Sequence, residues 1–323
     1  MKTVASQIWI LLLILICSNS SLIAQDFGDE YNSADVEVLR HITSQGGSWN
    51  CINWDQSKKP YRLYSLYLQN MRGSLDVTGC SSLHILECVS EYNNHLTSLK
   101  VNGCPVLQTL SCEGNQLSSL DVSGCSDLTS LWCSDNQLTT LNLSGCSKLT
   151  SLVCSGNMLT HINISGCPDL QSLALGCNQL TSIDVAGRSD LSFLECCSNQ
   201  LTRLDVSGCS NLTILWCYTN QLASLKLNGC LNLQALQCEG NQLTILDVSD
   251  CQKLKMLSCE ANHLTSLILG HNTALTDLDC SANDITSLNL ENSTALTDLN
   301  CAGNNLTSLN LENNADLSDI NCA

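Results

Sequence analysis

Leucine and isoleucine recur along this chain with a fixed step of 21 residues. Counted from the first leucine of each unit, large aliphatic residues stand at offsets 0, 3, 10 and 13, and a Val, Leu or Ile stands at offset 15. Polar residues alternate with them, which predicts two short strands per unit, each with one buried face. A fixed period of this length predicts a stack of coils. The units begin at Leu107, Leu128, Leu149, Leu170, Leu191, Leu212, Leu233, Leu254, Leu275, Leu296 and Leu317.

Two positions mark the corners of each unit. Asparagine fills offset 8, as in Asn136, and cysteine often fills offset 18, as in Cys146. Offsets 0, 3, 5 and 8 recur as 10, 13, 15 and 18, so one shorter motif is nested in the unit and the two corners are equivalent. A buried asparagine can satisfy backbone groups of the turn in its own coil and in the next. Cysteine is a small, weakly polar residue that can fill the same slot.

The pattern LxxLxCxxNQLTxLDVSGC resembles the leucine-rich repeat, in particular the nested 21-residue class of bacterial surface proteins of internalin type. The resemblance implies a solenoid whose parallel sheet, on one side, holds a protein partner. The opposite side of this family is usually helical or irregular, but here the second half of each unit reads as another strand. We therefore expect a β-rich leucine-rich repeat solenoid with parallel β-strands on both sides of flattened 21-residue coils and a small helical N-terminal cap.

The first residues have the pattern of a secretory signal peptide. In residues 1–24, Lys2 precedes an apolar run from Ile8 to Ile16, and small and polar residues follow up to Ala24. The run is short for a membrane span. Cys17 offers a lipidation site, but Ile16 before it does not suit that processing, so we expect cleavage after Ala24. The mature chain has no transmembrane segment, and we expect it to be secreted or held at the cell surface.

Residues 25–62 do not follow the repeat and are predicted to form the N-terminal cap, with the solenoid over residues 63–323. Ser33, Ala34 and Asp35 precede an amphipathic segment, which predicts a capped helix that ends at Gly46 and Gly47. The tryptophan-containing segment SWNCINWD follows, and the whole stretch resembles the cap of extracellular leucine-rich repeat proteins. A solenoid needs such a cap because its first coil exposes an apolar edge.

The solenoid departs from the repeat at its two ends. The coils that begin at Leu63 and Leu83 are degenerate, and the second of them carries three extra residues in the segment VSEYNNH, which we expect to bulge from the surface. The last unit, from Leu317, is incomplete.

Twenty-three cysteines in an exported chain first suggest a disulfide scaffold. Most of them recur at the same offset of consecutive coils, and stacked side chains point in parallel rather than at one another, although coils about 4.8 Å apart are within reach of a disulfide. We therefore expect buried free thiols that act as small core residues. The cysteines at offset 5 include Cys112, Cys133, Cys154, Cys196, Cys217, Cys238, Cys259, Cys280 and Cys301.

Within the regular units, two cysteines stand at neither offset 5 nor offset 18. Cys177 is at offset 7 of the unit that begins at Leu170, and Cys197 is at offset 6 of the next unit. Since they lie on adjacent coils near the surface, we predict a Cys177–Cys197 disulfide. No pair of CxxC motifs is present, so the sequence predicts neither a metal cluster nor any cofactor.

The formal charge of −17 argues against nucleic acid and anionic membranes as partners. Between Leu275 and Ala323 there are eight Asp or Glu and no Lys or Arg. A solvated acidic face explains them; a basic partner, or weak calcium binding by Asp277, Asp279 and Asp298, is the alternative. No catalytic motif is present either, because the six histidines occupy unrelated offsets and no HExxH or GxSxG occurs. We do not expect an enzyme.

The outward positions of the two strands differ. Those of the second strand are mostly Ser, Thr, Asp and Asn, whereas those of the first strand vary and carry every aromatic residue beyond the first irregular coils. Aromatics rimmed by carboxylates mark an interaction surface better than scattered apolar residues do, although aromatics are also good strand formers. We predict partner binding by Trp132, Val153, Phe193, Glu195, Trp216, Tyr218 and Met256.

The partner predicted from this surface is a macromolecule, most simply a protein on a host or neighbouring cell, and the family resemblance implies adhesion or host contact. A carbohydrate partner is the alternative, because aromatic rings with neighbouring carboxylates also suit sugar rings. Binding of ice or a crystal surface by the regular second face is a third hypothesis, which the Asp and Asn among its Ser and Thr residues disfavour.

Overall fold

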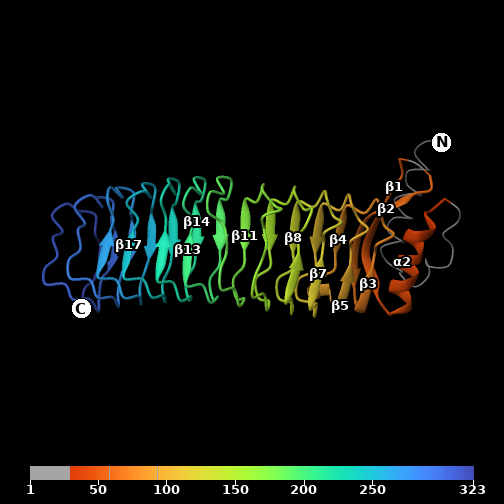
Figure 1. Cartoon of the computed structure of the whole chain (residues 1–323), viewed down its shortest axis with the longest axis horizontal. Coiled ribbons are helices and arrows are strands. Elements are labelled where there is room, and N and C mark those ends of the chain that lie inside the picture. Colours follow the sequence, from red (N-terminus) through yellow and green to blue (C-terminus); the bar gives the residue numbers. More distant parts are fainter. Residues whose placement is uncertain (1–29, 58, 93) are drawn as a thin grey trace. The chain divides into compact units, whose positions relative to one another are not determined.

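The protein is described by a computed structural model over residues 30–57, 59–92 and 94–323. The predicted signal peptide, the cleavage site after Ala24 and Cys17 lie outside these described residues. The described chain forms a leucine-rich repeat solenoid with one helix, α2 (Ser33–Ser44), near its beginning (Figure 1). The described residues divide into two compact units, the first made of those up to residue 158 with 163–168 and the second of residues 159–162 with 169–323.

The first unit contains a sheet of first strands in the order β1-β2-β4-β6-β8-β10. β1 pairs with β2 antiparallel, and the strands from β2 onward pair in parallel. On the second side, β3 pairs with β5 and β7 with β9. The elements after α2 are β1 (Ser48–Asp55), β2 (Arg62–Gln69), β3 (Arg72–Asp76), β4 (Ile85–Glu87), the 3-10 helix η1 (Ser90–Tyr92), β5 (His95–Lys100), β6 (Thr109–Ser111), β7 (Ser119–Asp121), β8 (Ser130–Trp132), β9 (Thr140–Asn142) and β10 (Ser151–Val153).

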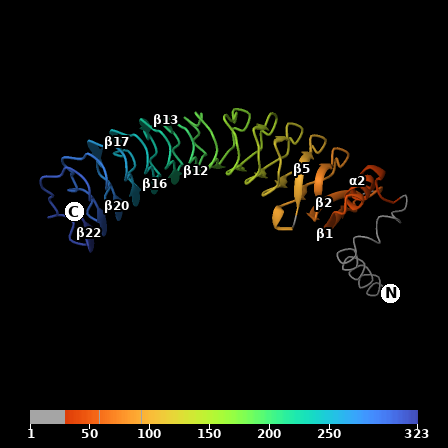
Figure 2. The ribbon, with the colours of Figure 1, turned by 90° about the horizontal axis from the view of Figure 1, so that it is seen from below.

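The second unit contains first strands in the order β11-β12-β14-β16-β18-β20-β21-β22 and the second-strand pairs β13–β15 and β17–β19. Figure 2 shows β12, β16, β20 and β22 along one side of this unit and β13 and β17 along the other. The strands are β11 (Ser172–Ala174), β12 (Phe193–Glu195), β13 (Arg203–Asp205), β14 (Ile214–Trp216), β15 (Ser224–Lys226), β16 (Ala235–Gln237), β17 (Ile245–Asp247), β18 (Met256–Ser258), β19 (Ser266–Ile268), β20 (Asp277–Asp279), β21 (Asp298–Asn300) and β22 (Asp319–Asn321).

The predicted fold class is confirmed, since parallel strands occur on both sides of the coils. The two sides are unequal, because the first strands form extended sheets while the second strands pair only two by two. Each strand is three residues long in the regular coils, since the chain must turn at the corners on both sides of it. The aliphatic residues at the predicted offsets fill the interior, and Leu128, Leu131 and Leu138 are fully buried. This apolar interior is the main stabilising term of the fold.

The corner asparagines connect each coil to the one before it. Nδ2 of Asn136 donates to the carbonyl of Cys133 in its own coil at 3.2 Å and to that of Cys112 in the preceding coil at 3.0 Å. Its Oδ1 accepts from the backbone N–H of Leu117 at 3.0 Å. Asn157, Asn241, Asn262 and Asn283 repeat these contacts. Backbone groups that the turns leave unpaired are therefore satisfied inside the protein.

The corner cysteines, those at offset 18, make the corresponding contact on the other side. The thiol of Cys146 donates to the carbonyl of Val122 at 3.3 Å, and the thiol of Cys230 donates to that of Val206 at 3.2 Å. Where asparagine occupies this corner the contact persists at a longer distance, as Nδ2 of Asn272 donates to the carbonyl of Val248 at 3.4 Å and also to that of Cys251 at 2.8 Å. The equivalence of the two corners predicted from the nested motif is thus present in the hydrogen bonds.

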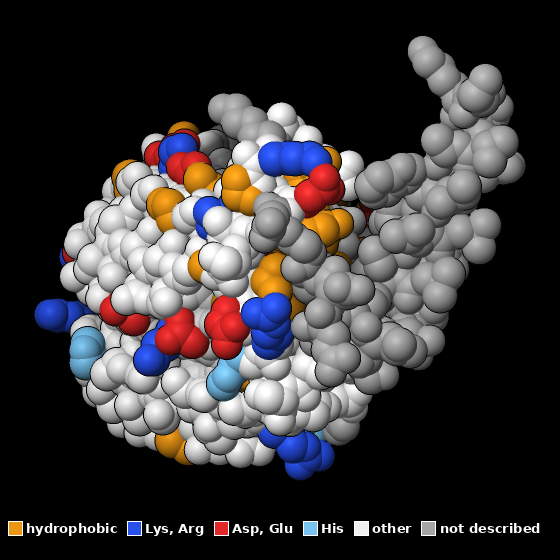
Figure 3. Space-filling view, turned by 90° about the vertical axis from the view of Figure 1, so that its right-hand side faces the viewer, with side chains coloured by type: hydrophobic (Ala, Val, Ile, Leu, Met, Phe, Trp, Pro, Cys, Tyr) orange, Lys and Arg blue, Asp and Glu red, His pale blue; other side chains and the backbone are white. Residues whose placement is uncertain are grey.

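The predicted helix of the cap is present as α2, and its N-cap is Asn32, whose Oδ1 accepts from Ala34 N at 3.1 Å. The helix is joined to the first coil by Asp35, which is fully buried and accepts from Arg62 Nε at 3.0 Å and from Leu63 N at 2.7 Å. Viewed from this end of the chain, charged side chains of both signs lie close together (Figure 3).

The three extra residues of the second irregular coil form η1 and displace the corner asparagine without removing it. Oδ1 of Asn94 accepts from Met71 N at 2.8 Å, and its Nδ2 donates to the carbonyls of Leu68 and Val89, both at 2.9 Å. Asn94 is fully buried. The insertion therefore leaves the hydrogen bonding of the corner intact.

Candidate binding surface

The outward face of the first strands in the second unit carries a continuous apolar row. Parallel pairing aligns Phe193 with Ile214, Ile214 with Ala235, and Ala235 with Met256. Met256 is 44% exposed, and Phe193 and Ile214 are half-buried. We call these four residues the apolar row. They meet because residues of equal offset lie opposite one another on parallel strands, so a step of 21 residues places them side by side.

Trp216 lies against this row. Its ring packs edge-to-face on that of Phe193, with centroids 5.3 Å apart and planes inclined by 83°. On the adjacent strand Glu195 lies opposite Trp216. Edge-to-face packing is a favourable arrangement for two aromatic rings and holds both in place. The structure thus brings together Phe193, Glu195 and Trp216 as the sequence predicted.

The same line of positions continues as an acidic row. Met256 lies opposite Asp277, Asp277 opposite Asp298, and Asp298 opposite Asp319, all in parallel register. A shallow hollow of about 470 Å³ is lined by Met256 and by the acidic row, together with Asp279 and Asn300. Like charges directly opposite one another on neighbouring strands are unfavourable. The chain therefore places carboxylates here at some cost in stability.

Two further carboxyl groups crowd the same face. Partial burial, and then the neighbouring Asp279, raise the pKa of Glu260. Asp279 has a lowered pKa although burial alone would raise it, because Ser281 and Asn300 donate hydrogen bonds to its carboxylate. These distances are 2.9 Å from Ser281 N, 2.6 Å from Ser281 Oγ and 2.9 Å from Asn300 Nδ2. Asp279 is consequently held as a fixed anion beside the acidic row.

Tyr218 follows β14, the strand that carries Ile214 and Trp216, and its phenol interacts with the thiol of Cys197. A hydrogen bond with the thiol of Cys197 raises the pKa of Tyr218 to about 12. The Cys197 thiol also lies 3.4 Å from Oε1 of Glu195. Burial raises the pKa of Cys197 to about 11, although the phenol of Tyr218 opposes that shift by donating to the thiolate. Tyr218, Cys197 and Glu195 therefore form one polar cluster.

In the first unit the predicted residues are fewer. Trp132 is 37% exposed and lies opposite Val153, which is half-buried, on the outward face of β8 and β10. On its other side Trp132 lies opposite a polar residue, Ser111. Trp132 and Val153 form a small apolar patch of their own.

The structure has the thiols of Cys177 and Cys197 unbonded, and the disulfide between them stays a prediction. The two residues are nevertheless neighbours, because the backbone N–H of Cys177 donates to the carbonyl of Cys197 at 3.0 Å. Cys177 is exposed and Cys197 is buried. Sequence reasoning passed over Ala235, which completes the apolar row; its offset, shared with Phe193, was the available signal.

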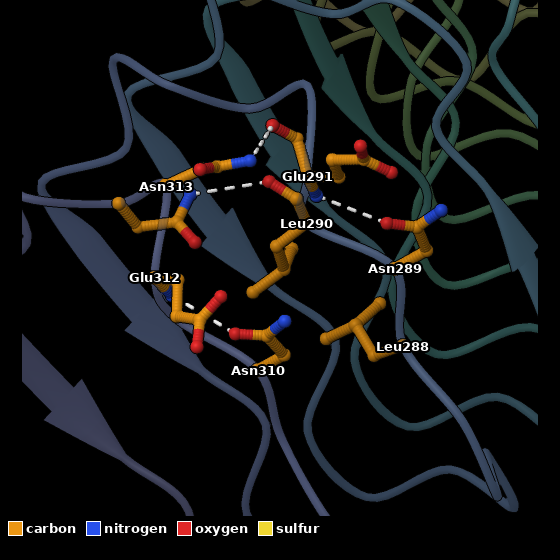
Figure 4. A pocket seen from close by; sticks show the side chains of 8 residues that line it. Leu288, Asn289, Leu290, Glu291, Asn310, Glu312 and Asn313 are labelled. Atoms are coloured by element: carbon orange, nitrogen blue, oxygen red, sulfur yellow. Dashed lines mark hydrogen bonds between the residues drawn. The ribbon is translucent and has the colours of Figure 1, made fainter.

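A second hollow, of about 200 Å³, lies between two coils on the second-strand side (Figure 4). Its polar groups close local turns: Oδ1 of Asn289 accepts from Glu291 N, and Oδ1 of Asn310 accepts from Glu312 N, each at 3.0 Å. Nδ2 of Asn313 donates to the carbonyl of Glu291 at 3.3 Å. These side chains are occupied in holding the backbone, so this hollow is a structural gap between turns.

Among the described residues no group of three or more His, Cys, Asp or Glu side chains is arranged to hold a metal ion. None of the helices in the described part of the chain has the length and apolar character needed to cross a membrane.

Comparison with known families and structures gives a consistent picture. A family model described as Leucine Rich repeats (2 copies) matches residues 105–146. No curated protein matches the chain in sequence. The functional domain of InlJ from Listeria monocytogenes, whose description includes a cysteine ladder, is 32% identical with a TM-score of 0.65. That alignment covers 75% of this chain and 54% of the InlJ domain, so this chain spans about half the length of that relative.

Two other solved structures share the fold. A leucine-rich repeat protein from Leptospira interrogans has a TM-score of 0.61 at 23% identity, over 78% of each chain. The internalin InlF from Listeria monocytogenes has a TM-score of 0.64 at 19% identity, over 83% of this chain and 92% of InlF. A scaffold of this kind is typical of proteins that act by protein–protein interaction rather than by catalysis. The chain has the leucine-rich repeat fold, and the solved structures that it resembles include bacterial leucine-rich repeat proteins of internalin type.

Proposed function

We propose that the chain binds a protein partner through the outward face of the first strands in its second unit. The observation that carries this proposal is the apolar row of Phe193, Ile214, Ala235 and Met256, aligned strand by strand and continued by an acidic row. Partly exposed aromatic and methionine side chains are enriched at protein interfaces. An apolar row bordered by charge supplies both the contact area and the specificity that such an interface needs.

The charge of this face indicates the chemistry of the partner. The acidic row, Asp279 and Glu260 gather negative charge around the hollow, and burial together with Asp279 already raises the pKa of Glu260. A partner that brings Lys or Arg side chains to the acidic row would relieve this repulsion and gain favourable electrostatic energy. Its apolar side chains would cover Phe193, Ile214 and Met256. The proposed partner is therefore a protein surface that combines basic with apolar residues.

A carbohydrate partner is supported less well. Sugar rings stack on the flat face of an aromatic side chain, and a binding platform needs that face to be free. Phe193 and Trp216 instead pack edge-to-face, so that one ring is used to hold the other. A glycan remains an outcome of the experiment rather than the leading proposal.

We further infer that the chain is exported and acts at the cell surface or outside the cell, in adhesion or contact with another cell. The support for export is the sequence of residues 1–24, in which Lys2 precedes the apolar run from Ile8 to Ile16. We also propose that residues 25–62 form the N-terminal cap of the exported chain and that residues 63–323 form its solenoid.

The test compares two double variants in capture of surface proteins from extracts of candidate cells. Phe193→Ala with Trp216→Ala removes the aromatic contact, whereas Ile245→Ala with Ile268→Ala removes exposed apolar side chains from the second-strand side, where they are 58% and 42% exposed. We expect a partner that wild type and the second variant both capture and that the first variant loses at least tenfold. Retention of the partner by the first variant would overturn the proposal.

A charge variant then tests the chemistry of the partner. Replacing Asp277 and Asp298 by Asn should weaken binding and reduce its dependence on salt, because fewer charges are screened. Binding that is insensitive to both salt and these substitutions would exclude a basic partner. Loss of binding after enzymatic removal of glycans from the captured protein would favour the carbohydrate alternative.

A further inference from the structure

We propose that Cys177 and Cys197 are a reversible disulfide site, and that closing it changes the Tyr218 border of the binding surface. The site is a redox switch on the surface described above. The link to binding rests on the proposed function, whereas the disulfide itself and its effect on Tyr218 do not.

The backbone places these two cysteines within reach of each other. The hydrogen bond of 3.0 Å from Cys177 N to the carbonyl of Cys197 makes them neighbours on adjacent coils. Adjacent strands lie about 4.8 Å apart, and a disulfide joins residues whose Cα atoms are about 4.4–6.8 Å apart. The spacing between the coils therefore suits a disulfide.

Their side chains escape the parallel arrangement that keeps the other cysteines apart. Stacked cysteines occupy equal offsets, so their Cα–Cβ bonds run side by side. Cys177 and Cys197 occupy different offsets, and Cys177 has a φ of 52°, the left-handed conformation that other residues at offset 7 such as Asp135 and Ser198 also adopt, so its Cα–Cβ bond does not run parallel to that of Cys197. Cys177 is also exposed, so a reagent in solvent can reach it.

The residue before Cys177 leaves room for the thiol of Cys197. A Cβ added to Gly176 would lie 3.0 Å from Sγ of Cys197 and 2.3 Å from Oε1 of Glu195. Both side chains thus lie over the backbone of Gly176, directly beside Cys177. A larger residue at this position would push the Cys197 thiol and the Glu195 carboxylate away from the backbone next to Cys177.

The switch acts through the contacts that Cys197 makes in its thiol form. Cys197 hydrogen-bonds with the phenol of Tyr218 and lies 3.4 Å from Oε1 of Glu195. A disulfide sulfur has no proton to donate and cannot become a thiolate that accepts from the phenol. Oxidation therefore removes the thiol contact that Cys197 makes with Tyr218 and with Glu195, and Glu195 lies opposite Trp216.

The chemistry balances with a small-molecule disulfide, such as oxidised glutathione, as the oxidant. The thiolate of Cys177 attacks one sulfur of the reagent and forms a mixed disulfide, while one thiolate of the reagent leaves. Cys197 gives its proton to water and attacks the Cys177 sulfur, and the second reagent thiolate leaves. Two protein thiols are oxidised to one disulfide, and the reagent is reduced to two thiols that take up the protons.

The first experiment treats the folded full chain with oxidised glutathione and then with dithiothreitol, followed by peptide mapping without reduction. We expect a peptide pair joined through Cys177 and Cys197, its loss in Cys177→Ser and in Cys197→Ser, and its retention in Cys322→Ser, which removes another exposed cysteine. A stable mixed disulfide at Cys177 without transfer to Cys197, or both thiols remaining free, would overturn the proposal.

The second experiment follows Tyr218 in the same samples by the absorbance of its phenolate. Oxidation should lower the pKa of Tyr218 from about 12 toward the ordinary value of 10, and Tyr218→Phe should abolish the difference between oxidised and reduced protein. An unchanged titration after the disulfide has formed would refute the switch. If no partner is found for the binding surface, the mapped disulfide and the titration still decide this inference separately.

Discussion

The thiol of Cys146 donates a hydrogen bond of 3.3 Å to the backbone carbonyl of Val122, 24 residues earlier in the chain. On the other side of the same coil Asn136 reaches back by the same 24 residues to the carbonyl of Cys112, at 3.0 Å. One small donor per corner therefore connects successive coils on both sides. Cysteine can occupy the corner on the second side because that corner is small and needs only one hydrogen-bond donor, which bonds to a carbonyl of the preceding coil.

Asparagine should replace a corner cysteine at low cost but should not replace a cysteine within a strand. Cys251 and Cys238 belong to the same unit at offsets 18 and 5, and both are fully buried. At the next such corner Nδ2 of Asn272 bonds to the carbonyls of Val248 and Cys251, while its Oδ1 is buried without a partner among the described residues, so Cys251→Asn should lower the free energy of unfolding by about 1–2 kcal/mol. Cys238→Asn should lower it by about 2–4 kcal/mol, because its amide finds no turn to satisfy. Urea unfolding under reducing conditions measures both, and equal costs would contradict the equivalence of the corners.

Removing a corner asparagine should destabilise the protein strongly. Nδ2 of Asn241 donates to the carbonyls of Cys217, Cys238 and Glu239 at 3.1, 3.0 and 3.3 Å, and its Oδ1 accepts from Leu222 N at 2.9 Å. Asn241→Ala leaves these buried groups without partners and should lower the free energy of unfolding by about 3 kcal/mol.

The control for that substitution is Asn228→Ala, at an exposed position of the neighbouring coil. It should alter stability by about 0.5 kcal/mol or less. Equal losses in the two variants would show that the corner amides contribute nothing beyond their side-chain volume.

The buried thiols should make the protein sensitive to alkali. Burial raises the pKa of Cys88 and of Cys280 to about 12 from an ordinary value of 9.0. Above pH 9 the unfolded chain loses these protons while the folded chain keeps them, so their contribution is complete below pH 9 and is lost as the pH rises toward 12. In this pH range the folded chain holds up to one more proton per thiol than the unfolded chain does. Each thiol therefore makes the free energy of unfolding fall by up to about 1.4 kcal/mol more per pH unit.

Urea unfolding at a series of pH values in reducing buffer tests this. Cys280→Ala should flatten the decline above pH 9, whereas Leu278→Val, a core change without a titrating group on the same strand, should lower stability and leave the slope unchanged. An identical slope in wild type and Cys280→Ala would contradict the assignment.

The junction between the cap and the first coil should depend on Asp35. This fully buried carboxylate accepts from Arg62 and from Leu63 N, and Asp35→Asn should destabilise the first unit by about 3 kcal/mol. Glu37→Gln is the matched control, because Glu37 and Arg40 form an exposed pair at 3.5 Å worth about 0.5 kcal/mol or less. Fluorescence of Trp49, which is buried in the cap, reports the local unfolding.

The period of 21 residues made the fold predictable. Each unit carries its leucines at the same offsets, and stacking the units as coils buries all of these leucines in one continuous core. The cap helix followed from its amphipathic pattern, although its first hydrogen bonds come from Asn32, one residue before the predicted segment. The displaced corner residue Asn94 was not predictable from offsets, since three inserted residues move it out of register.

The binding surface could be predicted only in part. Offsets place Phe193 and Trp216 on neighbouring strands, but the edge-to-face packing of their rings depends on side-chain rotamers that sequence spacing does not determine. The free thiols of Cys177 and Cys197 likewise depend on the redox conditions and not on the spacing. The contact of Tyr218 with Cys197 needed the structure.

Hydrogen bonds that always reach back by one coil give the gene a natural unit of insertion and deletion. Excision of residues 212–232 would bring the coil of Leu233 onto that of Leu191, and each corner donor would again meet a carbonyl of the same kind. Removal of a number of residues that is not a multiple of 21 would leave donors facing other groups, unless a local turn such as η1 restores the register. Recombination between repeats can therefore shorten or lengthen this protein while keeping it folded. Loss of residues 212–232 would also remove Trp216, whereas loss or gain of a unit between residues 233 and 274 would move the acidic row nearer to the aromatic pair or farther from it.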